Sequence, residues 1–234
     1  MRVAAPPRAH FYALGDERVV AHLPAELHAV DGEGEQPGTF TAVVSTFNTI
    51  VEGLFYDQML KPGCFEKSIA NAYPAPVWDH EWSTPPIGAC LDCRETTEGA
   101  ETKTRLFIGE DEDSPRAREV YTAMRAKNGD GRHVLREFSI GFRIVEAEWE
   151  VHDEREVLAI EEVIWWEYGP TLVGRNTSRL VDMHAAGSTA AGIPDPKDDP
   201  VLQKFGRPPS GGTHAPSPDA LALARAVHLA RPRV

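Results

Sequence analysis

A segment of alternating residues in the second half of the chain constrains the fold most. From Phe138 to Ile144, aromatic and aliphatic side chains occupy every second position, with Ser139, Gly141 and Arg143 between them. Side chains on a β-strand point to opposite faces with a period of two. The pattern therefore predicts a strand with one apolar face, and it places Ser139 on the other face, toward a cleft or water. Gly141 shares that face, which predicts that nothing bulky stands beside the serine hydroxyl.

Other segments extend this β-rich pattern. Strands are predicted at residues 40–45, 101–109 and 158–168 from their β-branched or alternating side chains. Two helices are predicted, one starting near Pro62 and one with Ser114 as its N-cap and Pro115 at its first position. Many strands and few helices predict an α+β or mainly β fold.

The chain divides into three zones. Its 234 residues are best read as one domain with tails. Residues 1–38 are predicted to be a partly flexible N-terminal lead with one strand, and residues 39–185 carry the periodic segments. Residues 186–234 contain 8 of the 19 prolines and are predicted to be a disordered tail, with a short helix at 218–230.

Composition narrows the function classes. The chain has 36 acidic and 24 basic side chains and a net charge of −12, which argues against a nucleic-acid-binding protein. No apolar run reaches the ~18 residues of a membrane span, and the N-terminus does not resemble a signal peptide. The 3 cysteines are expected to be reduced, in a cytoplasm. A homo-oligomer is compatible with the sequence, which does not specify the oligomeric state.

Three stretches carry a family resemblance through their order and spacing. They are Lys61–Phe65, then Trp78–Glu81 followed by Pro86–Gly88, and finally Phe138–Phe142. On these stretches, residues 39–185 resemble the prohead serine proteases of tailed bacteriophages, the enzymes that digest the scaffold inside an immature capsid.

The resemblance implies a fold and a set of catalytic residues. The fold would be similar to that of the herpesvirus assemblins, a small, mostly antiparallel β-barrel flanked by a few helices. The family's serine and histidine carry over to Ser139 and His80. The acidic position matches Glu167, where the Gly169-Pro170 pair departs from the family's usual Glu-Val-Ser-Leu-Val stretch.

These residue types fit the chemistry of a serine peptidase. A serine hydroxyl is a weak nucleophile until a base such as histidine takes its proton, and a carboxylate must orient the imidazole. Asp79 and Glu81 are alternatives to Glu167 as the acid that orients His80, but on a strand they would point away from the face of His80. Glu162 is a weaker rival to Glu167. Candidate oxyanion donors are backbone N–H groups beyond Ser139 or near Gly169-Pro170, and Arg143 or Arg175 acting through water.

The predicted function is therefore a phage prohead serine endopeptidase that acts through an acyl-enzyme, with no cofactor and no metal. Its predicted partners are the scaffold or the capsid-protein delta segment, inside the prohead in the host cytoplasm. Autoproteolysis is also expected, with a cut in the small, flexible stretch at 185–192.

A zinc-dependent hydrolase is a first alternative. Cys90 and Cys93, with His80 ten residues earlier, have part of the spacing of a zinc site. A deaminase signature is missing, because Glu81 adjoins His80 and Ala89 precedes Cys90. Strand alternation also predicts that the two cysteines lie on opposite faces, which disfavours a shared metal.

A second alternative is a catalytically inactive capsid-assembly or scaffold protein. In this reading the tail at 186–234 is a scaffold-like segment, and loss of the Ser139 hydroxyl has no functional consequence. A cysteine protease using Cys64 is disfavoured, because Cys64 begins a predicted helix, where a small core residue is expected.

Overall fold

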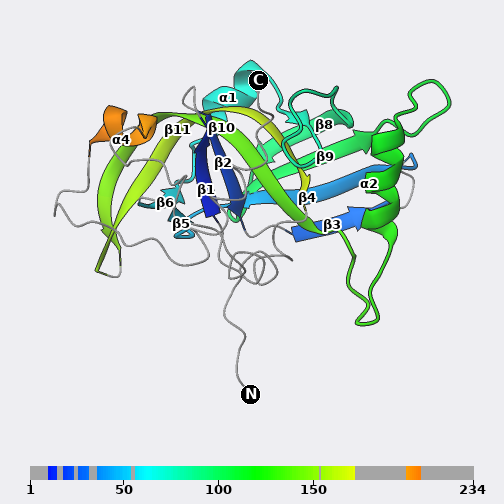
Figure 1. Cartoon of the computed structure of the whole chain (residues 1–234), viewed down its shortest axis with the longest axis horizontal. Helices are drawn as coiled ribbons and strands as arrows, with labels where there is room; N and C mark the ends of the chain where they lie inside the picture. The colour runs from blue at the N-terminus through cyan, green and yellow to red at the C-terminus, as the bar shows by residue number, and fades with distance from the viewer. Residues whose placement is uncertain are drawn as a thin grey trace, which may run out of the picture.

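The fold is mainly β with a few short helices (Figure 1). The computed structural model describes residues 10–14, 18–23, 26–31, 36–53, 56–152, 154–171 and 199–206. The strands are β1 (His10–Leu14), β2 (Arg18–Leu23), β3 (Glu26–Val30), β4 (Thr39–Thr46), β5 (Glu52–Gly53), β6 (Asp57–Leu60), β7 (Ala75–Pro76), β8 (Gly88–Glu95), β9 (Gly99–Leu106), β10 (Glu137–His152) and β11 (Arg155–Thr171). The helices are α1 (Glu66–Asn71), α2 (Pro115–Arg125) and α4 (Pro200–Phe205). The predicted strands and both predicted helices are present, but α1 begins at Glu66 and not near Pro62, β9 ends at Leu106 and not at residue 109, and β10 extends well beyond its predicted end.

The strands form two sheets. The larger has the order β5-β1-β2-β10-β11-β6, with β7 also paired to β11, and the smaller has the order β3-β4-β9-β8. Closure of a barrel requires the first and last strands to pair. Within the described ranges, both sheets end in edge strands, so the mainly β class is confirmed but the expected closed barrel is not seen.

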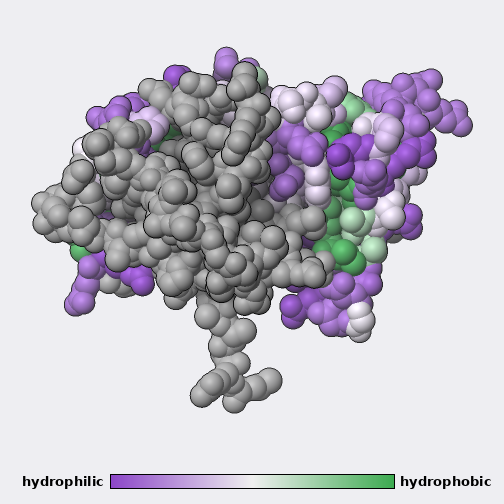
Figure 2. Space-filling model, in the orientation of Figure 1, coloured by the Kyte–Doolittle hydropathy of each residue, from purple (hydrophilic) through white to green (hydrophobic). Residues whose placement is uncertain are grey.

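One hydrophobic core joins the two sheets. The rings of Phe40 on β4 and Phe138 on β10 lie 5.7 Å apart, centroid to centroid. Phe65, just before α1, packs 4.7 Å from the ring of Trp165 on β11. The predicted apolar face of β10 is therefore the face that meets the smaller sheet. On the view in Figure 2, hydrophilic residues cover most of the described surface, with a narrow hydrophobic band toward the α2 side.

The Lys61–Phe65 stretch is a turn that starts α1. Gly63 has a φ of 94°, a left-handed conformation that glycine adopts without steric cost. The carboxylate of Glu95 accepts hydrogen bonds from the backbone N–H groups of Gly63 (2.6 Å) and Phe65 (2.7 Å). These donors at the helix start would otherwise lack partners. This stretch therefore has a structural role.

The N-terminal lead is more ordered than predicted. We expected one strand in residues 1–38, but β1, β2 and β3 all lie there. β2 pairs with β10 along Phe138–Arg143, and β3 pairs with β4. The reason is that β10 and β4 each have a second edge whose backbone N–H and C=O groups need partners.

The prediction of a disordered tail is wrong for residues 199–206. Asp199 caps α4 by accepting hydrogen bonds from the N–H groups of Val201 and Leu202, and both of these side chains are buried. The indole of Trp149 on β10 donates to the carbonyl of Phe205 at 3.2 Å. α4 is ordered because it buries apolar surface against the body of the protein. The predicted helix at 218–230 and the stretch predicted to be cut lie outside the described residues.

Candidate active site

The pairing of β10 with β11 brings Ser139 and Glu167 to one face of the larger sheet. In this antiparallel pair Ser139 lies opposite Gly169, and Gly141 lies opposite Glu167. Directly opposite residues project to the same side of a sheet. Ser139 and Glu167 therefore share the face that points away from Phe138 and the core.

The chain that carries His80 lies along the end of β11. The N–H of Val77 donates to the carbonyl of Tyr168 (2.8 Å), and the N–H of Asp79 donates to the carbonyl of Pro170 (3.3 Å). The chain then turns sharply, with φ values of 44° at Asp79 and 58° at His80. Such values are uncommon for residues other than glycine. This turn places the imidazole over the face that holds the serine and the glutamate.

The three predicted catalytic residues meet in one hydrogen-bonded series. The Nδ1 atom of His80 lies 2.7 Å from Oε1 of Glu167, and Nε2 lies 2.6 Å from Oγ of Ser139. The side chains of His80 and Glu167 are 14% and 4% exposed. Hydrogen bonds between partly or fully buried groups are little weakened by competing water.

The serine environment differs from prediction in one respect. Ser139 is on the predicted face and is only 1% exposed, which removes the alternative that it points into open water. However, the space beside Gly141 is filled. A Cβ atom added there would lie 1.9 Å from Oε1 of Glu167 and 3.0 Å from the ring of Trp82. Gly141 makes room for the carboxylate of the series.

The rival acids have other partners. Asp79 accepts a hydrogen bond from the hydroxyl of Thr171 at 2.6 Å, and Glu81 pairs with Arg116 at 3.7 Å. Glu162 pairs with Lys67 near the surface. The reason given for setting Asp79 aside was wrong, because residues 79–81 form a turn and not a strand.

The cysteine geometry also differs from prediction. A bulge in the pairing of β8 with β9 falls between Cys90 and Asp92, so simple alternation does not hold there. The two thiols lie together: a hydrogen bond with Cys93 lowers the pKa of Cys90, and the same bond, with burial, raises the pKa of Cys93. His80 does not join them, since both of its ring nitrogens face Ser139 and Glu167. Burial raises the pKa of the Cys64 thiol, which makes it a poor nucleophile.

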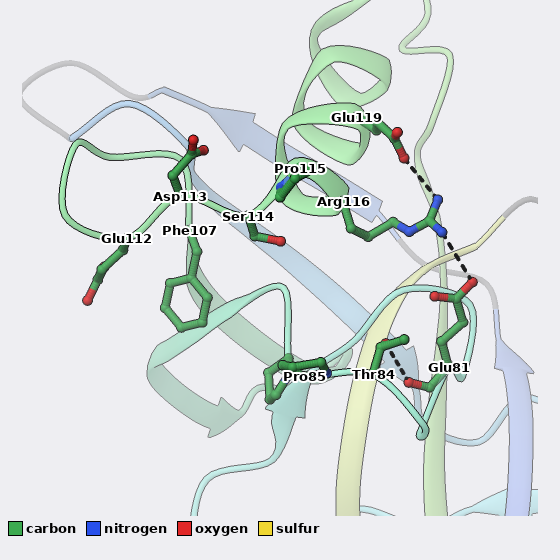
Figure 3. A pocket seen from close by; sticks show the side chains of 11 residues that line it. Glu81, Thr84, Pro85, Phe107, Glu112, Asp113, Ser114, Pro115, Arg116 and Glu119 are labelled. Carbon is green, nitrogen blue, oxygen red and sulfur yellow. Dashed lines mark hydrogen bonds and ion pairs between the residues drawn. The ribbon is translucent and has the colours of Figure 1, made fainter.

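Two cavities adjoin the site. The inner cavity, of about 530 Å³, is bordered by Glu167 and by apolar side chains that include Trp82 and Trp166. The outer cavity, of about 700 Å³, lies between the segment at 81–86 and the start of α2 (Figure 3). They share Thr84 and Pro86 in their walls.

A buried carboxylate, an imidazole and a serine hydroxyl bonded in this order are the arrangement of triad serine hydrolases. The chain belongs to the Caudovirus prohead serine protease family, whose family model matches residues 24–188. This is a family of serine proteases that act in capsid maturation, so the predicted resemblance is confirmed. No curated protein and no solved structure matches the chain. No helix in the described part is both long and apolar enough to cross a membrane.

The sequence interpretation missed the supporting roles of Gly141, Gly169 and Thr171. At Gly169 an added Cβ atom would lie 1.6 Å from the carbonyl oxygen of Val77, so this glycine admits the backbone next to His80. A glycine within a strand pattern marks such a close approach, and this signal could have identified Gly141 and Gly169. The bond between Thr171 and Asp79 has no comparable sequence signal.

Proposed function

We propose that this chain is the capsid-maturation endopeptidase of its phage, with Ser139 as nucleophile, His80 as general base and Glu167 as the residue that orients the imidazole. The single observation that supports these roles best is the pair of hydrogen bonds from Glu167 through His80 to Ser139. Family membership supports the reaction class.

The proposed reaction has two halves. Nε2 of His80 takes the proton of Ser139 as Oγ attacks the carbonyl carbon of the peptide bond. The tetrahedral intermediate collapses, the C–N bond breaks, the imidazolium gives its proton to the leaving amine, and an acyl ester remains on Ser139. Water then attacks this ester with His80 again as base, which releases the carboxylic acid and restores the hydroxyl. Glu167 accepts the Nδ1–H bond and stabilises the imidazolium in both halves.

The proposed substrates are the scaffold or capsid-protein delta segment and the enzyme itself, inside the immature capsid in the host cytoplasm. No cofactor or metal takes part in this proposal. For the enzyme itself we propose a cut at 185–192, a stretch of small residues, which would leave a fragment of about 190 residues. Because α4 packs on the body beyond that stretch, the severed tail would stay bound until α4 dissociates.

Two finer proposals concern the fold relationship, which rests on the resemblance, and the oxyanion donors, which rest on the residues themselves. One is a fold relationship to the herpesvirus assemblins, which the order and spacing of the three matched stretches support. The other concerns the oxyanion donors. Pro170 has no N–H group, which leaves Gly169 as the donor of that pair, while Arg175 lies outside the described residues.

The test compares wild-type protein with Ser139→Ala, each incubated alone at high concentration and with the scaffold and capsid proteins of the same phage. Intact masses are measured after denaturation, so that a tail held by α4 is still detected. Turnover should fall by roughly 10⁴–10⁶-fold in Ser139→Ala, because triad members act as a unit. Equal fragments from both proteins would indicate host proteases or an inactive capsid component and would overturn the proposal.

A further inference from the structure

We propose that the inner cavity is a specificity site that binds a large apolar side chain of the peptide substrate, within a few residues of the scissile bond. This inference rests on the proposed function and adds to it the class of side chain that the site selects. The cavity shares Glu167 with the hydrogen-bonded series, so a side chain bound there lies beside the carboxylate that contacts His80.

The walls of the cavity are mostly apolar. The rings of Trp82 and Trp166 meet edge to face, with centroids 6.3 Å apart and an interplanar angle of 86°. Ala75, Val77 and Pro86 complete the apolar wall. Trp166 is 37% exposed, although a large aromatic side chain gains most from burial. A substrate side chain bound in the cavity would cover this ring, and a volume of about 530 Å³ leaves room for a large side chain.

Electrostatics argues against a charged occupant. Glu167 is the one charged residue on the described wall of this cavity, and its Oε1 atom is already bonded to His80. A lysine or arginine of the substrate that paired with this carboxylate would weaken its attraction for the imidazolium of His80, and an acidic side chain would be repelled by it. The hydroxyl of Thr84 is bonded to the carbonyl of Glu81 at 2.9 Å. An uncharged, apolar side chain is the occupant that leaves the hydrogen-bonded series intact.

The outer cavity carries less selectivity. Figure 3 shows Arg116 between Glu81 and Glu119, with ion pairs of 3.7 and 2.9 Å to the two carboxylates. The other two carboxylates in the wall of the outer cavity belong to Glu112, which pairs with Arg105, and Asp113, which pairs with Arg118. Glu81 and Glu119 share Arg116, so the four carboxylates are paired with three arginines, and this cavity offers room for an extended peptide with only a small excess of negative charge to select one. The discrimination therefore falls on the inner cavity.

The experiment begins with an unbiased peptide mixture digested by the full-length protein, with Ser139→Ala as the blank, and the cleavage sites are read by mass spectrometry. We expect large apolar residues to be enriched at one position near the cut. Two peptides that differ only in Phe or Ala at that position then give the ratio of their kcat/KM values. Trp166→Ala should lower this ratio by about tenfold or more, because it removes one wall of the pocket.

Two further variants sharpen the result. Ala75→Leu, which adds bulk to the cavity wall, should favour the Ala peptide over the Phe peptide. Tyr73→Ala is the matched control, because Tyr73 is an aromatic residue that is 47% exposed and borders neither cavity. It should leave the ratio unchanged.

The outcomes separate this inference from the proposed function. Cleavage that depends on Ser139 but shows no apolar preference, or prefers Lys or Arg, would overturn the specificity site alone. An equal loss on both peptides in Trp166→Ala would do the same. No cleavage that depends on Ser139 would overturn the proposed function and this inference with it.

Discussion

The two ends of the β10–β11 pair are built differently. At the end that holds the site, Gly141 and Gly169 admit groups that would overlap a Cβ atom, and Ser139 and Glu167 are buried. At the other end, near the turn, Val151 is 71% exposed and Glu150 pairs with Lys61 at 3.1 Å. The same two strands thus hold a crowded, buried site at one end and a hairpin turn with exposed side chains at the other. The site therefore depends on the close approach of the Glu167 carboxylate to Gly141 and of the Val77 backbone to Gly169, and only glycine leaves room for these contacts.

The largest expected loss of activity comes from Glu167 on β11, and Glu162 on the same strand serves as its control. Glu167→Gln should lower kcat by up to about 10⁴-fold, because the amide no longer holds the imidazole in the required orientation and tautomer. Glu162→Gln should remain near wild type, since Glu162 pairs with Lys67 at the surface. Peptidase kinetics on both variants checks this. Near-normal rates in Glu167→Gln would remove Glu167 from its proposed role.

Gly141→Ala should have the next largest effect. Its Cβ would lie 1.9 Å from Oε1 of Glu167, so the carboxylate must move, and a displacement of about 1 Å in a catalytic array costs about 10²-fold in rate. The matched control is Gly129→Ala, where an added Cβ has no neighbour within 4 Å. Rates and unfolding midpoints of both variants are compared. Equal activities would mean that the site tolerates crowding and that this contrast between the two ends is wrong.

A smaller effect is expected from Thr171, which we infer to be a positioning residue. Thr171→Val removes the hydroxyl that holds Asp79, next to His80, at the end of β11. A hydrogen bond to a charged group contributes about 1.5–3 kcal/mol, so kcat should fall at least about tenfold with little change in KM. Thr171→Ser keeps the hydroxyl and should restore kcat. Equal losses in the Val and Ser variants would show that shape, and not this bond, is what matters.

The smallest effect concerns α4, which packs near the hairpin end of β10. Burial raises the pKa of Asp199 above its ordinary value of 3.8. At a pH between this ordinary value and the raised pKa of the folded state, the folded protein binds more protons than the unfolded chain. The contribution of Asp199 to stability therefore falls as pH rises through that window. Asp199→Asn keeps an oxygen that can accept the α4 N–H groups but does not titrate there.

The melting temperature of Asp199→Asn minus that of wild type should therefore increase from about pH 4 to about pH 7. Thermal unfolding of both proteins across this range gives the difference directly, and the other carboxylates cancel in it. A difference that stays flat or decreases would contradict the assigned direction.

The strands and the reacting residues could be predicted from sequence for different reasons. Alternation along Phe138–Ile144 reports directly on strand faces, so the side of Ser139 was right. Alternation says nothing about what covers a face, so the burial of Ser139 was left open and the crowding at Gly141 was missed. His80 and Glu167 were identified through family motifs, because their meeting depends on a turn with positive φ values that no local pattern specified.

Three other errors arose because contacts between distant segments decide the local structure. The order in the N-terminal lead and in α4 comes from tertiary partners, since β2 needs β10 and α4 needs the surface near Trp149. Local composition does not encode such partners. The bulge in β8 likewise brought Cys90 and Cys93 together against simple alternation.

The most direct test of the account is covalent labelling of the serine. A phosphonylating, serine-directed reagent is added to wild type, Ser139→Ala and His80→Ala, and the modified peptide is identified by mass spectrometry. The account predicts one label per wild-type chain, on Ser139, and no detectable label in either variant, because the hydroxyl needs the base that lies 2.6 Å away. Labelling of a different residue, or equal labelling of Ser139→Ala, would contradict the account.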